Sequence, residues 1–272
     1  RGKTATLWMT LGQPDDAFAA VERMLAANPE EPAAFDLLER IFAIPSRSMN
    51  PPPSGSLPPP SNDRVGEQGP RSARQRAALL LKPRYVAAGR TTELVRVLRV
   101  ELSVATSDAE RALVYRELAA LQLDALRDDA GAMDALAPLV VLEPADASHR
   151  RALADVAARL DRQDRRASVL VSAAERAPDD TVRASLLVEA AEVSRGPLGA
   201  PARAIDLYQR VLALASVERT TLLAAARELA GLLDATGRQA ERCEALEKLA
   251  ELETDAEARR AALGIVARIA SE

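Results

Sequence analysis

The chain repeats itself, and this feature constrains its fold more than any other. A segment that starts at Asp108 (Asp-Ala-Glu-Arg-Ala-Leu-Val-Tyr-Arg-Glu-Leu-Ala) returns in altered form at Asp180 and again at Asp255. These starts are 72 and 75 residues apart, and one more copy of a different type lies between each pair. Such periods are typical of stacked helical hairpins, because a single hairpin cannot bury its apolar face alone. The sequence therefore predicts an extended helical array that provides a surface rather than a catalytic centre.

Turns mark the ends of successive helices at nearly regular intervals. They fall at Pro29, Thr106, Pro144, Pro178, Ser216 and Thr254, and from Thr106 onward the spacings are 38, 34, 38 and 38 residues. Before most of these turns, apolar residues recur at intervals of four and then three, as in Ala204, Tyr208 and Val211. This spacing keeps one face of a helix apolar, and a proline at the turn then ends the helix.

Composition narrows the choices further. Hydrophobic residues make up 48% of the chain but aromatics only 3%, so we expect a core of Leu, Val and Ala in closely packed helices. The formal net charge of -4 provides no global basic field for a polyanion. The apolar runs are too short to cross a bilayer. The single cysteine, Cys243, excludes an intrachain disulfide, and we expect a soluble, cytoplasmic protein. The chain opens at Arg1 without a Met, so we also expect a piece of a larger protein.

The residues around the turns resemble a known family. The segment Arg203-Ala-Ile-Asp-Leu-Tyr-Gln-Arg-Val-Leu-Ala-Leu214 is similar to the second helix of a tetratricopeptide repeat, and Leu11-Gly-Gln-Pro-Asp-Asp-Ala17 resembles the turn inside such a repeat. The copies depart from the family pattern, because the large residue early in the first helix is mostly Leu or Arg and the final proline is often absent. The resemblance covers nearly everything except residues 45–71. It implies an all-α fold, a right-handed superhelix (solenoid) of stacked antiparallel helical hairpins.

Residues 45–71 interrupt the array. They are rich in Pro, Gly and Ser, a composition that is incompatible with a helix. We expect residues 1–44 to form a hairpin plus one extra helix at about 32–43, and residues 72–272 to form about five hairpins with a terminal helix. The interruption is either a boundary between two arrays, which we prefer, or a long loop within one array. Pro83, in the helix that follows, either kinks that helix or splits it.

Residues suited to catalysis or metal binding are scarce. The only histidine, His149, stands at an expected helix start, where we interpret it as a solvated first-turn residue with Asp146 or Ser148 as the helix cap. Cys243 is expected to be a small packing residue in an Ala-rich helix. One His and one Cys do not supply the usual metal-binding clusters. The sequence therefore predicts no catalytic residue, no cofactor and no metal site.

One stretch of the chain is strongly basic. Its members are Arg71, Arg74, Arg76, Lys82, Arg84, Arg90, Arg96 and Arg99, opposed by Glu93 and Glu101. Few aromatic residues accompany them, so nucleic-acid bases would have little to stack on. We interpret the stretch as a solvated helix face, with contact to nucleic acid as the alternative.

The family resemblance also implies where a partner would bind. In tetratricopeptide arrays the first helix of each hairpin lines a concave face that holds an extended peptide or a partner helix. Carried over by register, this face would present Arg116, Arg151, Asp155, Glu192 and Glu228. The resulting hypothesis is a non-catalytic protein–protein interaction scaffold for a protein or peptide partner. The alternatives are a regulatory or sensor segment of a larger multidomain enzyme, and a nucleic-acid-binding helical solenoid.

Overall fold

The computed structural model describes residues 2–10, 12–44 and 72–271. In these ranges the chain forms helices and turns and contains no strand, which confirms the all-α prediction. The helices are α1 (Gly2–Thr10), α2 (Pro14–Ala27), α3 (Pro32–Phe42), α4 (Ala73–Ala87), α5 (Thr91–Val104), α6 (Asp108–Ala120), the π-helix η1 (Leu121–Leu126), α7 (Asp129–Leu142), α8 (Ala147–Arg159), α9 (Gln163–Glu175), α10 (Asp180–Arg195), α11 (Pro201–Leu212), α12 (Arg219–Ala235), α13 (Gln239–Leu252) and α14 (Ala256–Ile269).

The helix boundaries follow from local sequence signals. Each turn expected from the spacing comes two to four residues after a helix end, as at Pro144 after α7 and Thr254 after α13. Side-chain caps begin many of the helices, because an unpaired backbone N–H needs an acceptor. Ser72 and Ser107 form capping boxes with Gln75 and Glu110 at the starts of α4 and α6. The remaining side-chain caps are the aspartates Asp128, Asp146, Asp179 and Asp255.

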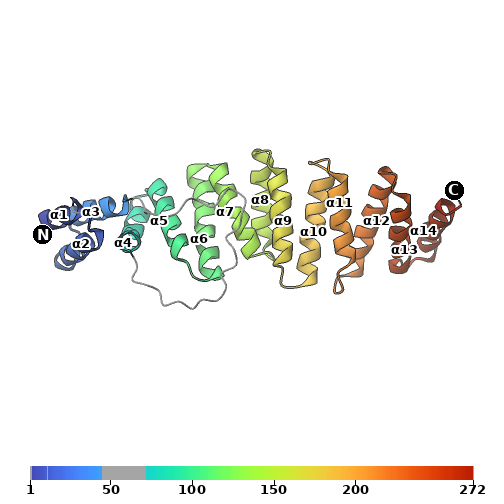
Figure 1. Cartoon of the computed structure of the whole chain (residues 1–272), viewed down its shortest axis with the longest axis horizontal. Helices are drawn as coiled ribbons and strands as arrows, with labels where there is room; N and C mark the ends of the chain where they lie inside the picture. The colour runs from blue at the N-terminus through green and yellow to red at the C-terminus, as the bar shows by residue number, and fades with distance from the viewer. Residues whose placement is uncertain (1, 11, 45–71, 272) are drawn as a thin grey trace. The chain divides into compact units, whose positions relative to one another are not determined.

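The chain divides into two compact units, Arg1–Arg127 and Asp128–Glu272. Each is a series of helices that pack mainly on their neighbours in sequence, and the helices can be followed in order in Figure 1. Such nearest-neighbour packing is the defining property of a helical solenoid. The division lies after Arg127, a non-glycine residue with a left-handed backbone (φ 54°) that ends the π-helix.

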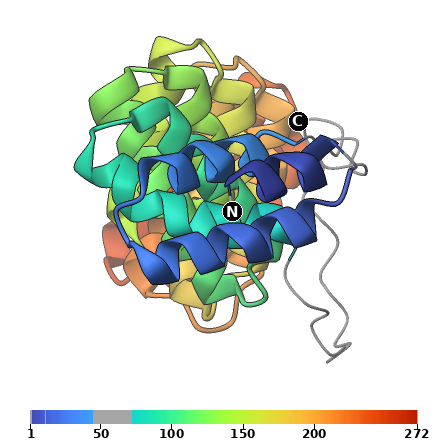
Figure 2. The same cartoon turned by 90° about the vertical axis from the view of Figure 1, so that its left-hand side faces the viewer.

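In the first unit, helix α4 packs against α2 and α3, which Figure 2 shows in blue. Arginines of α4 lie over the rings of all three phenylalanines of the chain. The distances from guanidinium carbon to ring centroid are 5.6 Å for Arg74 over Phe42, 4.3 Å for Arg76 over Phe18 and 3.8 Å for Arg84 over Phe35. Arg76 also pairs with Asp15 at 2.8 Å. A cation over an aromatic face is attracted by the ring quadrupole, so these contacts join α4 to the N-terminal helices.

This packing bears on the expected division at residues 45–71. These residues lie outside the described part of the chain. Helices α3 and α4, on either side of them, lie in the same compact unit and pack together. The division into 1–44, 45–71 and 72–272 remains a prediction for proteolysis to test.

The first unit contains two local features that the sequence pattern left open or did not predict: the course of α4 at Pro83 and the end of α6. Helix α4 runs through Pro83 without a break, so the helix is not split there. Helix α6 continues into the π-helix η1, which the helical periodicity did not predict. A π-turn adds a residue per turn and changes which side chains face the neighbouring helices.

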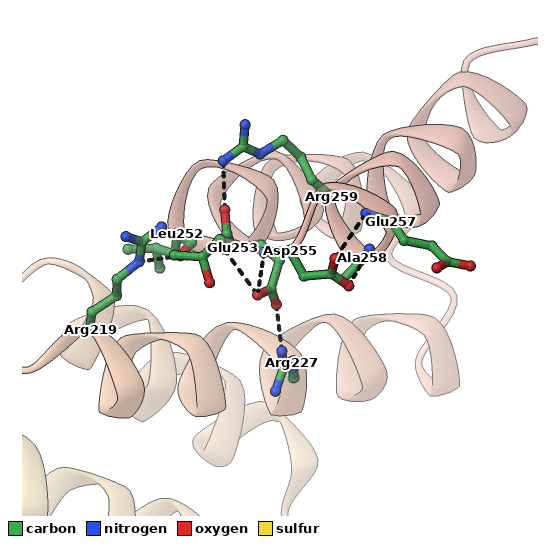
Figure 3. Close-up of polar contacts among 9 residues, drawn as sticks. Arg219, Arg227, Leu252, Glu253, Asp255, Glu257, Ala258 and Arg259 are labelled. Carbon is green, nitrogen blue, oxygen red and sulfur yellow. Dashed lines mark hydrogen bonds and ion pairs between the residues drawn. The ribbon is translucent and has the colours of Figure 1, made fainter.

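The second unit buries mainly Ala, Leu and Val, as the composition predicts. Tyr208 is the largest fully buried side chain there, 1% exposed. At the last turn, Glu253 is buried between α13 and α14, and Figure 3 shows Arg227 of α12 directed at its carboxylate. Arg219 and Arg259 donate to the backbone carbonyls of Leu252 and Glu253. These charge-assisted hydrogen bonds connect the last three helices.

Candidate functional site

The first unit contains a groove that is lined by residues of three helices. It lies between α4, α5 and α6 and has a volume of about 310 Å³. Helix α4 contributes Gln75, Ala78, Leu79 and Lys82; α5 and its end contribute Val100, Glu101, Val104 and Ala105; α6 contributes Glu110, Leu113, Val114 and Glu117. We call this the α4–α6 groove. Its volume is at the lower end for ligand sites, enough for a few side chains.

A shared ion pair connects the three helices of the groove. The Lys82 ammonium lies 2.8 Å from Glu101 Oε2 and 2.9 Å from Glu117 Oε2. Burial alone would lower the pKa of Lys82, but its hydrogen bonds to Glu101 and Glu117 outweigh this and raise the pKa. The side chain of Glu101 is 17% exposed and that of Glu117 is 53% exposed. One ammonium therefore serves two carboxylates, and the outer carboxylate remains open to solvent.

Two large apolar side chains of the groove are open to solvent. Leu113 is 57% exposed and Leu79 is 44% exposed. Their neighbours Leu81 and Leu98 are fully buried and account for the packing of α4 and α5. Exposed leucines that line a concavity have apolar surface available for a partner.

The residues predicted to line a concave face lie on the expected first helices. Arg116 is exposed on α6 in the first unit, but it does not line the groove. Arg151 and Asp155 are exposed one helical turn apart on α8. Glu192 is exposed on α10 and Glu228 is partly exposed on α12. Their role in binding stays a prediction.

The structure brings two of these residues together around one aromatic ring. Glu228 pairs with Arg195 at 2.8 Å, and both Glu228 and Glu192 act on the nearby Tyr208 hydroxyl. Desolvation by burial, followed by the charge of Glu228, raises the pKa of Tyr208 to about 12. The ring therefore stays neutral, and the surrounding charges form a small polar cluster on α10 and α12.

Sequence reasoning missed two ion pairs on α10 that lie about one helical turn before the predicted residue Glu192. Glu189 of α10, rather than Glu192, accepts from Arg166 at 2.7 Å and pairs with Arg150 at 3.4 Å. It also missed the groove residues Leu79, Lys82 and Leu113. The signal available was the run of leucines from Leu79 to Leu81, since a helix cannot bury three successive side chains on one face.

The basic stretch is largely engaged inside the first unit. Besides the arginine–phenylalanine contacts and the Lys82 pairs, Arg90 pairs with Glu39 and with Glu93 and lies over the Tyr85 ring at 4.8 Å. Arg96 and Arg99 remain exposed on α5. The expectation of a solvated helix face therefore holds for the exposed Arg84, whereas Arg74 and Arg76 are partly buried against the rings of Phe42 and Phe18.

His149 also differs from expectation. Its side chain is 12% exposed rather than solvated, and Nδ1 lies 3.3 Å from Glu143 Oε2 and 3.6 Å from Asp146 Oδ2. The reason is the turn before α8, which holds both carboxylates against the ring. Asp146 caps α8 through its other oxygen, as expected, and the hydrogen bond from the Ser148 hydroxyl, together with this cap, lowers the pKa of Asp146. The three groups lie close enough to share a cation, but the helix-capping role of Asp146 already accounts for its position. Cys243 is a half-buried thiol in α13.

Helices and their neighbour-to-neighbour packing define an all-α protein of the helical-solenoid class. No family model matches the chain, and no curated protein sequence matches it. The chain is similar to the crystal structure of the MamA protein, with 16% identity over 66% of this chain and 91% of that chain and a TM-score of 0.35. It is also similar to a tetratricopeptide repeat protein from Parabacteroides merdae ATCC 43184, with 11% identity over 97% and 96% of the two chains and a TM-score of 0.30.

A third similar structure is the TPR domain of P58(IPK), with 14% identity over 98% of this chain and 76% of that chain and a TM-score of 0.28. At these identities the likeness concerns the helical architecture alone, and it transfers no partner or activity to this chain. Among the described helices, none is long and apolar enough to span a membrane.

Proposed function

We propose that this chain is a non-catalytic scaffold that binds a protein or peptide partner, with the α4–α6 groove as a principal contact. The observation that carries the proposal is the exposure of Leu79 and Leu113 in a groove. Binding energy at protein interfaces concentrates in a few side chains that fill pockets. Both leucines stand on helices that the repeat pattern assigns as first helices, the elements expected to face a partner.

The mechanism of such a scaffold is geometric. The stacked helices hold the groove in one shape, so a partner loses entropy on binding but the scaffold loses little. The ion pairs of Lys82 fix α4, α5 and α6 relative to one another. The partner would then contact a surface that already exists before binding.

The nucleic-acid alternative has less support. A phosphate backbone requires available cations, and the α4 arginines are engaged by aromatic rings and by Asp15 within the first unit. The alternative of a regulatory segment in a larger enzyme is compatible with the same groove. It differs from the scaffold proposal in requiring a catalytic domain outside this chain.

Site-specific photocrosslinking tests the proposal directly. A benzophenone amino acid placed at Leu113, in the full chain and in native lysate, should crosslink a partner that mass spectrometry identifies. The matched control is the same probe at Val86, which is 59% exposed on α4 but outside the groove. Equal crosslinking of the same partner from both positions would show that the groove is not the contact.

Charge reversal tests the contribution of the first-helix residues. Arg116→Glu with Arg151→Glu should weaken the captured partner, because a desolvated charge contact is worth about 2 kcal/mol or more. The control pair, Arg210→Glu with Lys248→Glu, lies on the second helices α11 and α13. Loss of binding in the control pair alone would place the working surface on the second helices.

A further inference from the structure

The α4–α6 groove has an unbalanced set of charges. It contains three carboxylates, Glu101, Glu110 and Glu117, and the single ammonium of Lys82. Glu110 caps α6: its Oε2 accepts from the backbone N–H groups of Thr106 at 2.7 Å and Ser107 at 3.4 Å. The helix N-terminus stabilises that charge. The excess of negative charge therefore centres on Glu101 and Glu117, which share Lys82.

Nearby arginines are directed to other partners. The α4 residues Arg74, Arg76 and Arg84 lie over phenylalanine rings of α2 and α3. On α6, Arg111 pairs with Asp108 at 3.1 Å. None of these four lines the groove. A second cation that enters the groove would consequently meet the open carboxylate of Glu117, for which Lys82 is the only cationic competitor in the groove lining.

The apolar part of the groove adjoins this charge. Leu79 stands one turn before Lys82 on α4, and Leu113 stands one turn before Glu117 on α6. Residues three or four apart on a helix are neighbours on the same face. The α4 wall and the α6 wall of the groove thus each present an exposed leucine beside a member of the Lys82 ion pair.

We propose that the α4–α6 groove selects a peptide that presents a lysine or arginine next to leucine-sized apolar side chains. This inference rests on the proposed scaffold function and names the chemistry of its partner. The basic side chain pairs with Glu117 and supplies the second positive charge, while the apolar side chains cover Leu79 and Leu113. An acidic peptide would instead meet excess negative charge, and such juxtaposition disfavours a wrong partner.

The test uses a random twelve-residue peptide library displayed on phage, selected on the full chain. Selected peptides are synthesised with a fluorophore, and their affinities are measured by fluorescence polarisation. We expect lysine or arginine beside Leu, Ile or Phe in the selected sequences. Leu113→Ala should weaken binding about tenfold, since it removes a central apolar contact. Glu117→Gln should weaken binding about threefold or more and reduce its dependence on salt.

Val86→Ala serves as the matched control and should leave affinity unchanged, because Val86 is exposed on α4 outside the groove. Circular dichroism of each variant verifies that the helices are intact. Selection of acidic or uncharged peptides that depend on Leu113 would overturn the inference while the proposed function stands. If no selected peptide depends on Leu113, both the inference and the groove as a contact are wrong.

Discussion

The contacts between arginines of α4 and phenylalanines of α2 and α3 should stabilise the N-terminal helices measurably. We consider the triple replacement of Arg74, Arg76 and Arg84 by Gln, which keeps the length and polarity of each side chain but removes the charge. The replacement abolishes three cation–ring contacts at 5.6, 4.3 and 3.8 Å and the pair between Arg76 and Asp15 at 2.8 Å.

The magnitude follows from the exposure of these contacts. Each cation–ring contact at a partly exposed site contributes about 0.5–1 kcal/mol. An exposed ion pair such as that of Arg76 adds roughly 0.2–1 kcal/mol. We therefore expect the free energy of unfolding of the first unit to fall by about 2–4 kcal/mol, which shifts a urea midpoint by roughly 1 M or more.

The chain provides a convenient probe for this measurement. Trp8 is its only tryptophan and lies in α1, which packs on α2 and α3. Fluorescence of Trp8 during urea titration thus reports the N-terminal helices, while circular dichroism at 222 nm reports helices throughout the chain.

The control is the double replacement Arg96→Gln and Arg99→Gln, two exposed arginines on α5 of the same basic stretch. It should change the midpoint little, because surface substitutions usually lie within about 0.5 kcal/mol. An unchanged Trp8 midpoint in the triple variant, or an equal shift in the control, would refute the reasoning.

Three further predictions concern other parts of the chain. Hydrogen bonds from Arg227 and from backbone N–H groups lower the pKa of Glu253. The ionised Glu253 should therefore stabilise the fold fully above the pKa of an unfolded glutamate, about 4.3. This stabilisation should be lost as the pH falls through the lower pKa of Glu253 in the folded chain. Thermal unfolding between pH 7 and 3 should show this acid loss in the wild type and less of it in Glu253→Gln; identical profiles would contradict it. Cys243→Ala should lower the free energy of unfolding by about 1 kcal/mol or less and leave partner affinity unchanged, whereas loss of binding after rapid thiol modification would show a functional thiol. Limited proteolysis should cut first between Ser46 and Ser72 and leave a stable fragment from about residue 72 onward, and the N-terminal piece should co-elute with it because α3 packs on α4; first cleavage elsewhere would argue against this.

The sequence predicted features that depend on short-range patterns. The turn at Ser216 could be placed because Ala204, Tyr208 and Val211 repeat at helical spacing, and all three are buried on α11. The cap at Asp146 follows from the preference of acidic residues for helix starts. These signals act within a few residues, so a single sequence contains them.

Features that depend on contacts between distant residues could not be predicted in this way. Lys82 meets Glu101 and Glu117, which are 19 and 35 positions further along the chain, and the groove exists only once α4, α5 and α6 have packed. Nothing in the apolar spacing distinguishes the π-helix after Ala120 from a continued α-helix. The five predicted face residues depended on a register, and one residue of error turns a side chain by about 100° around a helix.

The packing of α4 on α2 and α3 has a consequence for how copies of the chain interact. The phenylalanine rings of α2 and α3 bind the arginines of α4 through the same kind of contact that a protein makes with a separate basic peptide. Residues 45–71 connect the two, and their length sets the effective concentration at which they meet. The same contacts could form between two copies, each giving its first three helices to the other. Shortening the connection should therefore turn an internal contact into an exchange between molecules, without altering any residue that makes it.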